Sequence, residues 1–391
     1  MTLETLLAEL LLEPPAAAEA RAAAAFDRIA APFENRIVVF GAGQLGRLAA
    51  SGLRAAGVAP LAFCDNNPRL WDTRVDGTPV LPPATAAGRY RDSAAFITAI
   101  YNPSAIRNQL RELGCPRIVP YPALFWKHWR FMPGEDRLEL PHRILARAGE
   151  LAAGYELLSD RRSRDEFCAQ IRWRCLLDYD SLPQPDEPEA TYFPADLFGL
   201  QPDEVFVDCG AFDGDTIRSF LRLTEGQFGR IVAVEADPAN LQALERYRSG
   251  LPPETARRIA VLPYAVGKTD GVVRFSAGGL VASKILEAGA GHTVKCRKLD
   301  TALVGCPTLI KMDIEGAEPD ALLGAPGIMA RCRPIMAVCA YHKCDHHWTH
   351  PQHLKAGNPD YRIFLRRYAE ECWETVYYAI PPERLKRRPR A

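Results

Sequence analysis

The stretch VFVDCGAFDGDT, Val205–Thr216, decides the fold expected for the second half of this 391-residue chain. An apolar run leads into a turn with two glycines, Gly210 and Gly214, and a helical pattern follows. A strand, a glycine turn and a helix in this order begin α/β units that bind ligands at the carboxyl ends of parallel strands. Glycines let the backbone approach a ligand closely, so we expect a ligand at this turn.

The turn is acidic, because Asp208, Asp213 and Asp215 crowd it. Three carboxylates repel a pyrophosphate, whereas they attract a ligand that carries an ammonium and a sulfonium group. Glu235 lies near the end of the next expected strand, Arg230–Asp237, where a carboxylate can accept hydrogen bonds from both ribose hydroxyls. These residues predict an S-adenosylmethionine site rather than a nicotinamide site. The alternative is an acidic loop on an ordinary α/β domain.

Strands and helices alternate through the rest of this half, which predicts a doubly wound, mostly parallel sheet. GVVRFS and HTVKCRKLD predict an inserted hairpin between the third and fourth strands. The last strand is expected to be antiparallel. The expected strands are Glu204–Gly210, Arg230–Asp237, Arg258–Gly267, Thr308–Gly316, Pro334–His342 and Glu374–Pro381.

The segment KMDIEGAE, Lys311–Glu318, places four charged side chains at the end of an apolar strand. Burying such charges costs free energy unless they are paired or take part in binding or catalysis. Because side chains alternate along a strand, Lys311, Asp313 and Glu315 point to the same side and can form a network. The alternative to a catalytic role is a lysine–carboxylate network that only braces the loop.

These motifs follow one another in an order that resembles a known family. DCGAFDGDT, VEADP, AVG (Ala265–Gly267), KMDIEGAE and YHK (Tyr341–Lys343) resemble the FkbM-type S-adenosylmethionine-dependent methyltransferases over about Phe193–Pro381. The resemblance implies a class I methyltransferase fold. It also implies methylation of a hydroxyl on a sugar, a glycan or a related secondary metabolite. The expected partners are therefore S-adenosylmethionine and a small-molecule or glycan acceptor.

The resemblance also assigns roles to individual residues. It places Glu235 at the ribose, Tyr264 or Ala265 beside the adenine, and Asp313 near the transferred methyl group. Asp208, Gly210 and Gly214 would surround the methionine part. The full expected cofactor site is Asp208, Gly210, Ala211, Asp213, Gly214, Thr216, Glu235, Asp237, Tyr264, Ala265 and Asp313.

Transfer to a hydroxyl needs a base that removes its proton. The candidates are His342, at the end of the last parallel strand, and Asp313 or Glu315 opposite it, with Lys311 as the fourth expected catalytic residue. Histidine is the better base near neutral pH. The alternative is a His342 that is hydrogen-bonded inside the site and transfers no proton.

The stretch YHKCDHHWTHPQH contains a histidine pair, His346 and His350, at the i, i+4 spacing of metal ligands on one helix face. We nevertheless expect solvent-exposed or adventitious histidines here, and no metal. Asp313 and Glu315 are the alternative, as ligands of a hard cation that orients the acceptor.

A second glycine turn, RIVVFGAGQLGR, lies at Arg36–Arg47. Gly41, Gly43 and Gly46 stand between an expected strand and helix, and Asp65 follows at the spacing of a ribose-binding acid. About half a Rossmann fold surrounds them, without residues suited to hydride transfer. The turn binds a nucleotide or sugar nucleotide, or it has a structural or substrate-presenting role. The alternative functions are an NAD-linked oxidoreductase or epimerase and a non-catalytic sugar-nucleotide-binding protein.

Composition limits the class of protein. Lys plus Arg (48) balances Asp plus Glu (48), so nothing directs the chain to nucleic acid or an anionic membrane. No uncharged apolar run of about 18 residues occurs, so no transmembrane helix is expected. Eleven scattered cysteines predict buried reduced thiols in a cytoplasmic protein. The expected parts are an N-terminal helical segment (1–30), a smaller Rossmann-like half-domain (31–140), a helical and proline-rich linker (141–195) and the methyltransferase domain (196–391).

Overall fold

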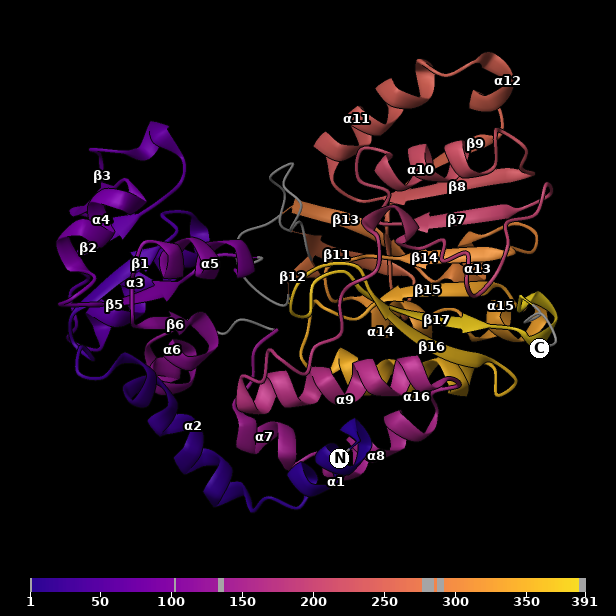
Figure 1. Ribbon diagram of the computed structural model, residues 1–391. Helices are drawn as coiled ribbons and strands as arrows, with labels where there is room; N and C mark the ends of the chain where they lie inside the picture. Colours follow the sequence, from indigo (N-terminus) through magenta and orange to yellow (C-terminus); the bar gives the residue numbers. More distant parts are fainter. Residues whose placement is uncertain (1, 102, 133–136, 276–284, 287–291, 387–391) are drawn as a thin grey trace. The chain divides into compact units, whose positions relative to one another are not determined.

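The computed structural model describes residues 2–101, 103–132, 137–275, 285–286 and 292–386 (Figure 1). The chain divides into two compact units. The first comprises Met1–Ala148 and Cys168–Pro183, and the second comprises Gly149–Phe167 and Gln184–Ala391. The chain therefore enters the second unit, returns to the first and enters the second again before it reaches the acidic glycine turn.

The first unit contains a six-stranded sheet of order β3-β4-β2-β1-β5-β6. All neighbouring strands are parallel except β3 and β4. This sheet is larger than the half fold expected. The β3–β4 hairpin was missed, although the dipeptide Asp76-Gly77 at its turn is typical of type I′ hairpin turns. Both residues adopt the positive φ that this turn requires, 48° and 78°. The strands are β1 (Ile37–Phe40), β2 (Ala62–Cys64), β3 (Arg74–Val75), β4 (Thr78–Leu81), β5 (Ala95–Thr98) and β6 (Ile118–Pro120).

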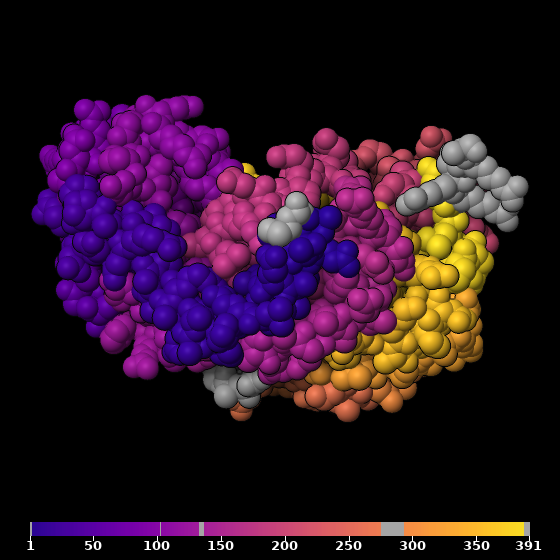
Figure 2. All heavy atoms as spheres, turned by 60° about the horizontal axis from the view of Figure 1, so that its bottom comes forward, coloured from indigo at the N-terminus to yellow at the C-terminus, as the bar shows by residue number. Residues whose placement is uncertain are grey.

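Helices of the first unit bury alanine-rich faces. In α2, Ala18, Ala22 and Phe26 recur at the i, i+4 spacing of one helix face, and all three are buried. The other face of α2 lies at the surface, in indigo in Figure 2. The helices are α1 (Leu3–Leu11), α2 (Pro15–Ala30), α3 (Gln44–Ala55), α4 (Pro83–Tyr90), α5 (Ser104–Glu112), α6 (Tyr121–His128) and α7 (Pro141–Leu145), with short 3₁₀ turns at Pro68–Leu70 and Trp129–Phe131.

The second unit contains a seven-stranded sheet of order β16-β17-β15-β14-β7-β8-β9, and Figure 1 shows the strands in this order from one edge to the other. Strand β17 runs antiparallel to both of its neighbours, β15 and β16, and the other neighbouring strands are parallel, which confirms the expected doubly wound, mostly parallel sheet with an antiparallel last strand. The edge strand β16 was not predicted. The strands are β7 (Val205–Cys209), β8 (Arg230–Glu235), β9 (Ile259–Pro263), β14 (Leu309–Met312), β15 (Ile335–Cys339), β16 (Arg362–Arg367) and β17 (Thr375–Ile380).

The inserted hairpin belongs to a small second sheet of order β10-β13-β11-β12. Its strands β11 (Gly271–Phe275) and β13 (His292–Arg297) pair antiparallel, as the sequence predicted. The other two strands are β10 (Ala265–Val266) and β12 (Ile285–Leu286). The helices of this unit are α10 (Asp215–Leu223), α11 (Pro238–Ser249), α12 (Pro253–Ala256), α13 (Leu299–Ala302), α14 (Glu318–Leu323), α15 (Pro326–Arg331) and α16 (His346–Gly357), with 3₁₀ turns at Pro188–Ala190 and Pro382–Arg384.

The segment expected to be a linker contributes to both units. Helix α8 (Ala148–Glu156) and the first half of α9 (Arg161–Leu176) belong mainly to the second unit, and the second half of α9 belongs to the first. Further along, Phe193 packs edge-on against Phe206 with ring centroids 5.7 Å apart, and Phe206 stacks on Phe220 at 4.8 Å. This segment therefore supplies part of the core beneath the seven-stranded sheet.

Two cysteines differ from the expectation of reduced thiols. Cys306 and Cys332 form a disulfide with Cα atoms 5.2 Å apart, so the expectation is wrong for this pair. Their separation of 26 residues carries no sequence signal for pairing. The other nine cysteines are buried, as predicted. Among the described residues, no helix is both long and apolar enough to cross a membrane.

Candidate active site

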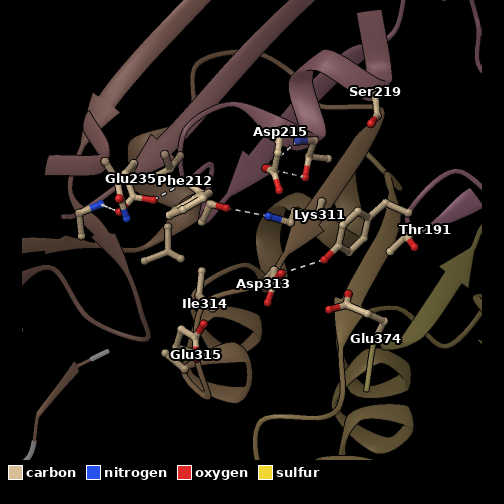
Figure 3. Close-up of a pocket in the computed structure, with 18 of the residues that line it drawn as sticks. Thr191, Phe212, Asp215, Ser219, Glu235, Lys311, Asp313, Ile314, Glu315 and Glu374 are labelled. Carbon is tan, nitrogen blue, oxygen red and sulfur yellow. Dashed lines mark hydrogen bonds between the residues drawn. The ribbon is translucent and has the colours of Figure 1, made fainter. Parts of the chain in front are cut away.

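A cavity of about 470 Å³ lies where the carboxyl ends of β7, β8 and β14 meet the start of β17 (Figure 3). Because β17 is antiparallel, its first residues lie at the same sheet edge as the last residues of the parallel strands. Figure 3 shows Glu235 at one end of the cavity and Thr191 and Glu374 at the other. The lining also includes Tyr192, Gly210, Phe212, Asp215, Thr216, Ser219, Tyr264, Ala265, Lys311, Asp313, Glu315 and Tyr341.

Glu235 ends β8 and holds the glycine turn in place. Its Oε2 accepts a hydrogen bond from the Phe212 backbone N–H at 2.9 Å, and its Oε1 accepts from Ala236 and Asp237 at 2.8 and 2.7 Å. A carboxylate oxygen can accept two bonds, so Oε2 retains acceptor capacity toward the cavity. Burial raises the pKa of Glu235 although these three bonds oppose the shift. The geometry suits a ligand with ribose hydroxyls.

Gly210 lets the glycine turn pack directly on the end of β14. Its φ is +80°, and a Cβ at this position would lie 1.9 Å from the backbone oxygen of Asp313. A side chain here would therefore separate the two strand ends that form the cavity.

We expect Gly210→Ala to lower stability by about 1–3 kcal/mol more than a change that only strains φ. Gly226→Ala is the matched control, because Gly226 has a φ of +74° and a Cβ added there would meet no atom within 4 Å. Urea unfolding measures both variants. Equal losses would show that backbone strain, and not the close approach to Asp313, accounts for the effect.

The acidic residues of the turn are largely paired. Asp208 is fully buried, with its Oδ1 2.9 Å from Lys311 Nζ, and Asp213 forms an ion pair with Arg218 at 2.6 Å. Asp215 lines the cavity, and its Oδ1 accepts a hydrogen bond from the Thr216 N–H at 2.7 Å. Of the three carboxylates, only that of Asp215 therefore lines the cavity.

Lys311 connects the turn to β14. Its Nζ donates a hydrogen bond to the Gly210 carbonyl at 2.7 Å. Burial lowers the pKa of Lys311, but the charges of Asp208 and Asp313 outweigh burial and raise that pKa well above its usual value. Lys311 is thus a permanent cation that neutralises the buried Asp208.

Asp313 is held by three neighbours. Its Oδ2 accepts a hydrogen bond from Tyr192 Oη at 2.8 Å, its Oδ1 accepts one from Tyr341 Oη at 3.2 Å, and His342 Nε2 lies 3.2 Å from Oδ1. Burial raises the pKa of Asp313, but the bond from His342 and the charge of Lys311 outweigh it, so the pKa is well below its usual value. A carboxylate so strongly acidic is a poor proton acceptor.

Glu374, directly before β17, has the opposite environment. Burial and the charge of Asp313 raise the pKa of Glu374 to about 7, against the opposing charges of His342 and Lys311. Its φ is +51°, a strained value for a non-glycine residue. Three other cavity residues, Tyr192 (φ 69°), Phe212 (φ 46°) and Glu315 (φ 56°), share this conformation, and such strain concentrates at functional sites.

His342, the expected base, does not line the cavity. Its Nδ1 lies 2.9 Å from Glu318 Oε1 and its Nε2 lies near Asp313, so carboxylates face both ring nitrogens. Burial lowers the pKa of His342, but the two carboxylates raise it well above its usual value. An imidazolium behind Asp313 holds that carboxylate rather than accepting a proton, which agrees with the alternative stated above.

The end of the cavity near Tyr264 suits an aromatic base. Tyr264 and Ala265 both line it, and the buried Tyr264 Oη has no hydrogen-bond partner in the described part of the chain. An adenosine with a charged methionine tail therefore fits the donor set: Tyr264 beside the base, Glu235 at the ribose and Asp215 for the ammonium.

The structure brings together most, but not all, of the expected residues. Gly210, Thr216, Glu235, Tyr264, Ala265, Lys311, Asp313 and Glu315 line the cavity. Asp208, Ala211, Asp213, Gly214 and Asp237 do not, because they are buried under the turn, paired, or used as helix caps. The residues missed by sequence reasoning include Thr191, Tyr192, Ser219 and Glu374.

The histidines after β15 are not exposed as expected. His342, His346, His347 and His350 are all buried. Burial lowers the pKa of His350 to about 4 and that of His346 well below its usual value, so both imidazoles are neutral. They lie behind the cavity and not in its lining.

The first glycine turn is organised like the second. The Oδ2 of Asp65 accepts a hydrogen bond from the Ala42 N–H at 2.8 Å, as Glu235 does from Phe212. A Cβ on Gly46 would lie 1.8 Å from the Gly41 oxygen, whereas one on Gly43 would meet nothing within 4 Å. The turn is thus braced by Asp65 and open at Gly43.

Comparison with known proteins identifies the domain that carries the cavity. Residues 208–371 match the family model of the methyltransferase FkbM domain. This region is an FkbM methyltransferase domain. The enzyme class that the sequence predicted, an S-adenosylmethionine-dependent methyltransferase, is confirmed, and so is the resemblance of this region to the FkbM-type family.

One solved structure with a TM-score above 0.5 shows the same fold. The crystal structure of methyltransferase FkbM from Methylobacillus flagellatus KT is 21% identical, with a TM-score of 0.73 over 96% of each chain. Precorrin-6y C5,15-methyltransferase of Geobacter metallireducens is 14% identical, with a TM-score of 0.30 over 50% of this chain and 85% of its own. Aeropyrum pernix fibrillarin, solved with S-adenosyl-L-methionine, is 13% identical, with a TM-score of 0.30 over 49% and 73%. No curated protein matches the sequence.

Proposed function

We propose that the FkbM methyltransferase domain methylates a hydroxyl of a sugar, a glycan or a related metabolite, with Glu374 as the general base. One observation carries this proposal: two carboxylates in one cavity have pKa values shifted in opposite directions, Asp313 downward and Glu374 to about 7. Such a pair separates a permanent anion from a proton acceptor.

The two ends of the cavity have different tasks in this proposal. Glu235, Asp215 and Tyr264 hold the cofactor, which supplies an electrophilic methyl group when it is bound. Thr191, Ser219 and Glu374 face the other end, and their oxygens can hydrogen-bond a polyhydroxylated acceptor (Figure 3).

Glu374 would accept the proton that the acceptor hydroxyl loses when the methyl group passes from the cofactor sulfur, whose bond to the methyl carbon breaks, to the hydroxyl oxygen. The carboxylate of Asp313, fixed by Tyr192 and Tyr341, stays ionised and stabilises the positive charge near the methyl position. Holding the acceptor in line between these groups supplies a further part of the rate enhancement.

A labelled-methyl assay tests the proposal on sugars, sugar nucleotides and glycans. On an acceptor without nitrogen, alkali-stable label indicates an ether, formed at a hydroxyl, whereas alkali-labile label indicates an ester. We expect alkali-stable transfer to at least one carbohydrate. Cofactor binding without transfer to any acceptor class would favour the non-catalytic alternative.

Titration calorimetry with S-adenosylhomocysteine and NAD tests which of the two glycine turns binds a ligand. We expect S-adenosylhomocysteine to bind and Glu235→Gln to weaken binding by about tenfold or more, since a charged hydrogen bond contributes about 1.5–3 kcal/mol. A nucleotide or sugar nucleotide at Gly41–Gly46 remains a proposal, supported by the open Gly43. Tight NAD binding without S-adenosylhomocysteine binding would favour the oxidoreductase instead.

Buried thiols such as those of Cys64, Cys209 and Cys339 support a cytoplasmic location, whereas disulfides such as Cys306–Cys332 are typical of oxidising compartments. Alkylation in denaturant, followed by mass spectrometry of protein from freshly lysed cells, shows whether Cys306 and Cys332 are labelled, as reduced thiols would be, or protected by the disulfide.

A further inference from the structure

Behind the cavity, one carboxylate and two histidines form a buried group that the proposed reaction does not use. Glu318 begins α14, and His346 and His350 lie one turn apart on α16. Their exposed fractions are 0%, 1% and 0%. We call these three residues the Glu318 cluster.

Several polar atoms of the Glu318 cluster lack partners. In the described part of the chain, Glu318 Oε2, both ring nitrogens of His346 and Nδ1 of His350 have no hydrogen bond. Buried polar atoms are almost always hydrogen-bonded, so four such atoms in one place indicate a missing partner. His346 Nδ1 lies 3.5 Å from Glu318 Oε2, and the rings of His346 and His350 lie 4.3 Å apart.

His350 has the orientation of a metal ligand. Its Nε2 lies 3.0 Å from the Cys339 carbonyl oxygen, so Nε2 carries the proton and Nδ1 presents its lone pair. Histidines that bind metals commonly donate the other ring N–H to a backbone carbonyl or a carboxylate in this way. The neighbouring His347 instead stacks on Phe167 with ring centroids 4.7 Å apart and lies outside the cluster.

We propose that Glu318, His346 and His350 bind a divalent transition-metal ion, with Zn²⁺ as the best fit. Two imidazole nitrogens and one carboxylate oxygen are ligands that zinc prefers, whereas calcium and magnesium require oxygen ligands. One ligand atom from each residue lies within 4.8 Å of the others. Tetrahedral ligands at zinc distances stand about 3.3 Å apart, so side-chain shifts of about an ångström close the site.

The ion stabilises the turn that carries Asp313. Glu318 Oε1 accepts a hydrogen bond from the Ile314 N–H at 2.9 Å and faces His342 Nδ1 at 2.9 Å, while Oε2 faces α16. None of the three ligands lines the cavity, so the ion does not contact the acceptor. Its role is to fix α16 to the start of α14 and thereby hold the Asp313 turn.

Metal analysis of the full-length protein tests the proposal. After chelator treatment, Zn²⁺ loading and gel filtration, we expect about one zinc per chain. His346→Ala and His350→Ala should each remove most of it. His353→Ala, which changes a half-buried histidine of the same helix outside the cluster, should retain it. Zinc should also raise the midpoint temperature of thermal unfolding of the wild type and of His353→Ala. It should not raise that of His346→Ala or His350→Ala.

Substitution with Co²⁺ provides a readout that needs no variant to fold. The intense visible absorption of tetrahedral Co²⁺ in the wild-type chain, displaced by one equivalent of Zn²⁺, supports the site. The absence of bound metal in the loaded wild type overturns the proposal. Equal metal content in wild type and His350→Ala, or loss of metal in His353→Ala, places the ion elsewhere and also overturns it.

Discussion

Glu374→Gln is expected to lower kcat by about 10²–10⁴-fold, the usual contribution of a positioned general base. The amide keeps the size of the side chain but cannot accept a proton. Because Glu374 lies away from the Glu235 end of the cavity, the affinity for S-adenosylhomocysteine should not change (Figure 3). Steady-state kinetics with labelled cofactor and calorimetry measure the two quantities.

The pH profile gives an independent readout. The pKa of Glu374 is raised to about 7 by burial and by the charges of Asp313 and Asp215, against the charges of His342 and Lys311. A base works only when it is deprotonated, so kcat/KM should rise with pH and level off above about 7. The rising limb should be absent from the residual activity of Glu374→Gln.

Glu225→Gln is the matched control for this variant. Glu225 is exposed, lies outside the cavity and has the same φ of +51° as Glu374. It controls for replacing a glutamate in this backbone conformation, and its kcat should equal that of the wild type. An unchanged kcat in Glu374→Gln would remove Glu374 as the base.

Lys311→Met is expected to lower the free energy of unfolding by about 3–5 kcal/mol, because it leaves Asp208, whose pKa burial raises to about 6 even beside Lys311, buried without its cation. Lys311 and Asp208 are 2% and 0% exposed, and their charged atoms lie 2.9 Å apart. The double variant Lys311→Met with Asp208→Asn removes both charges and should recover much of the loss. Urea unfolding measures both.

A surface pair provides the comparison. Lys268 faces Asp320 at 3.4 Å with both side chains at least half exposed, so Lys268→Met should cost less than about 1 kcal/mol. If Lys311→Met were no more destabilising than Lys268→Met, the Asp208–Lys311 pair would not be the structural centre of the turn.

Local patterns predicted the methyltransferase sheet well. Glycine turns and buried apolar runs such as Val205–Cys209 report the strand and its ligand edge directly. Strand β16 was missed because its arginines, including Arg366 and Arg367, disguise an almost fully buried strand. They are tolerated there since each meets a carboxylate, Asp160 or Glu166, that lies some 200 residues earlier.

The candidate site shows the same division between local and long-range information. Lys311 and Asp313 belong to one motif and could be predicted together. Glu374 belongs to no motif, yet the sequence contained a usable signal. An antiparallel last strand that starts at Glu374 must bring that residue to the edge where the parallel strands end.

Tyr192 carried no such signal. Its hydroxyl meets Asp313 across 121 residues of chain, and its position follows from the packing of Phe193 into the core. The burial of His346 and His350 was equally hidden, because a polar helix gives no hydrophobic periodicity from which burial could be inferred.

The path of the chain between the two units decides how the enzyme can be divided by genetic truncation. A fragment that starts at residue 196 lacks the Tyr192 hydroxyl that holds Asp313 and the Phe193 ring beneath the sheet. A fragment that includes Gly149–Phe167 must also carry Cys168–Pro183, which belongs to the first unit. No single cut therefore separates the catalytic unit intact: removal of the first unit needs a new start at Gly149 and, in addition, an internal deletion of Cys168–Pro183.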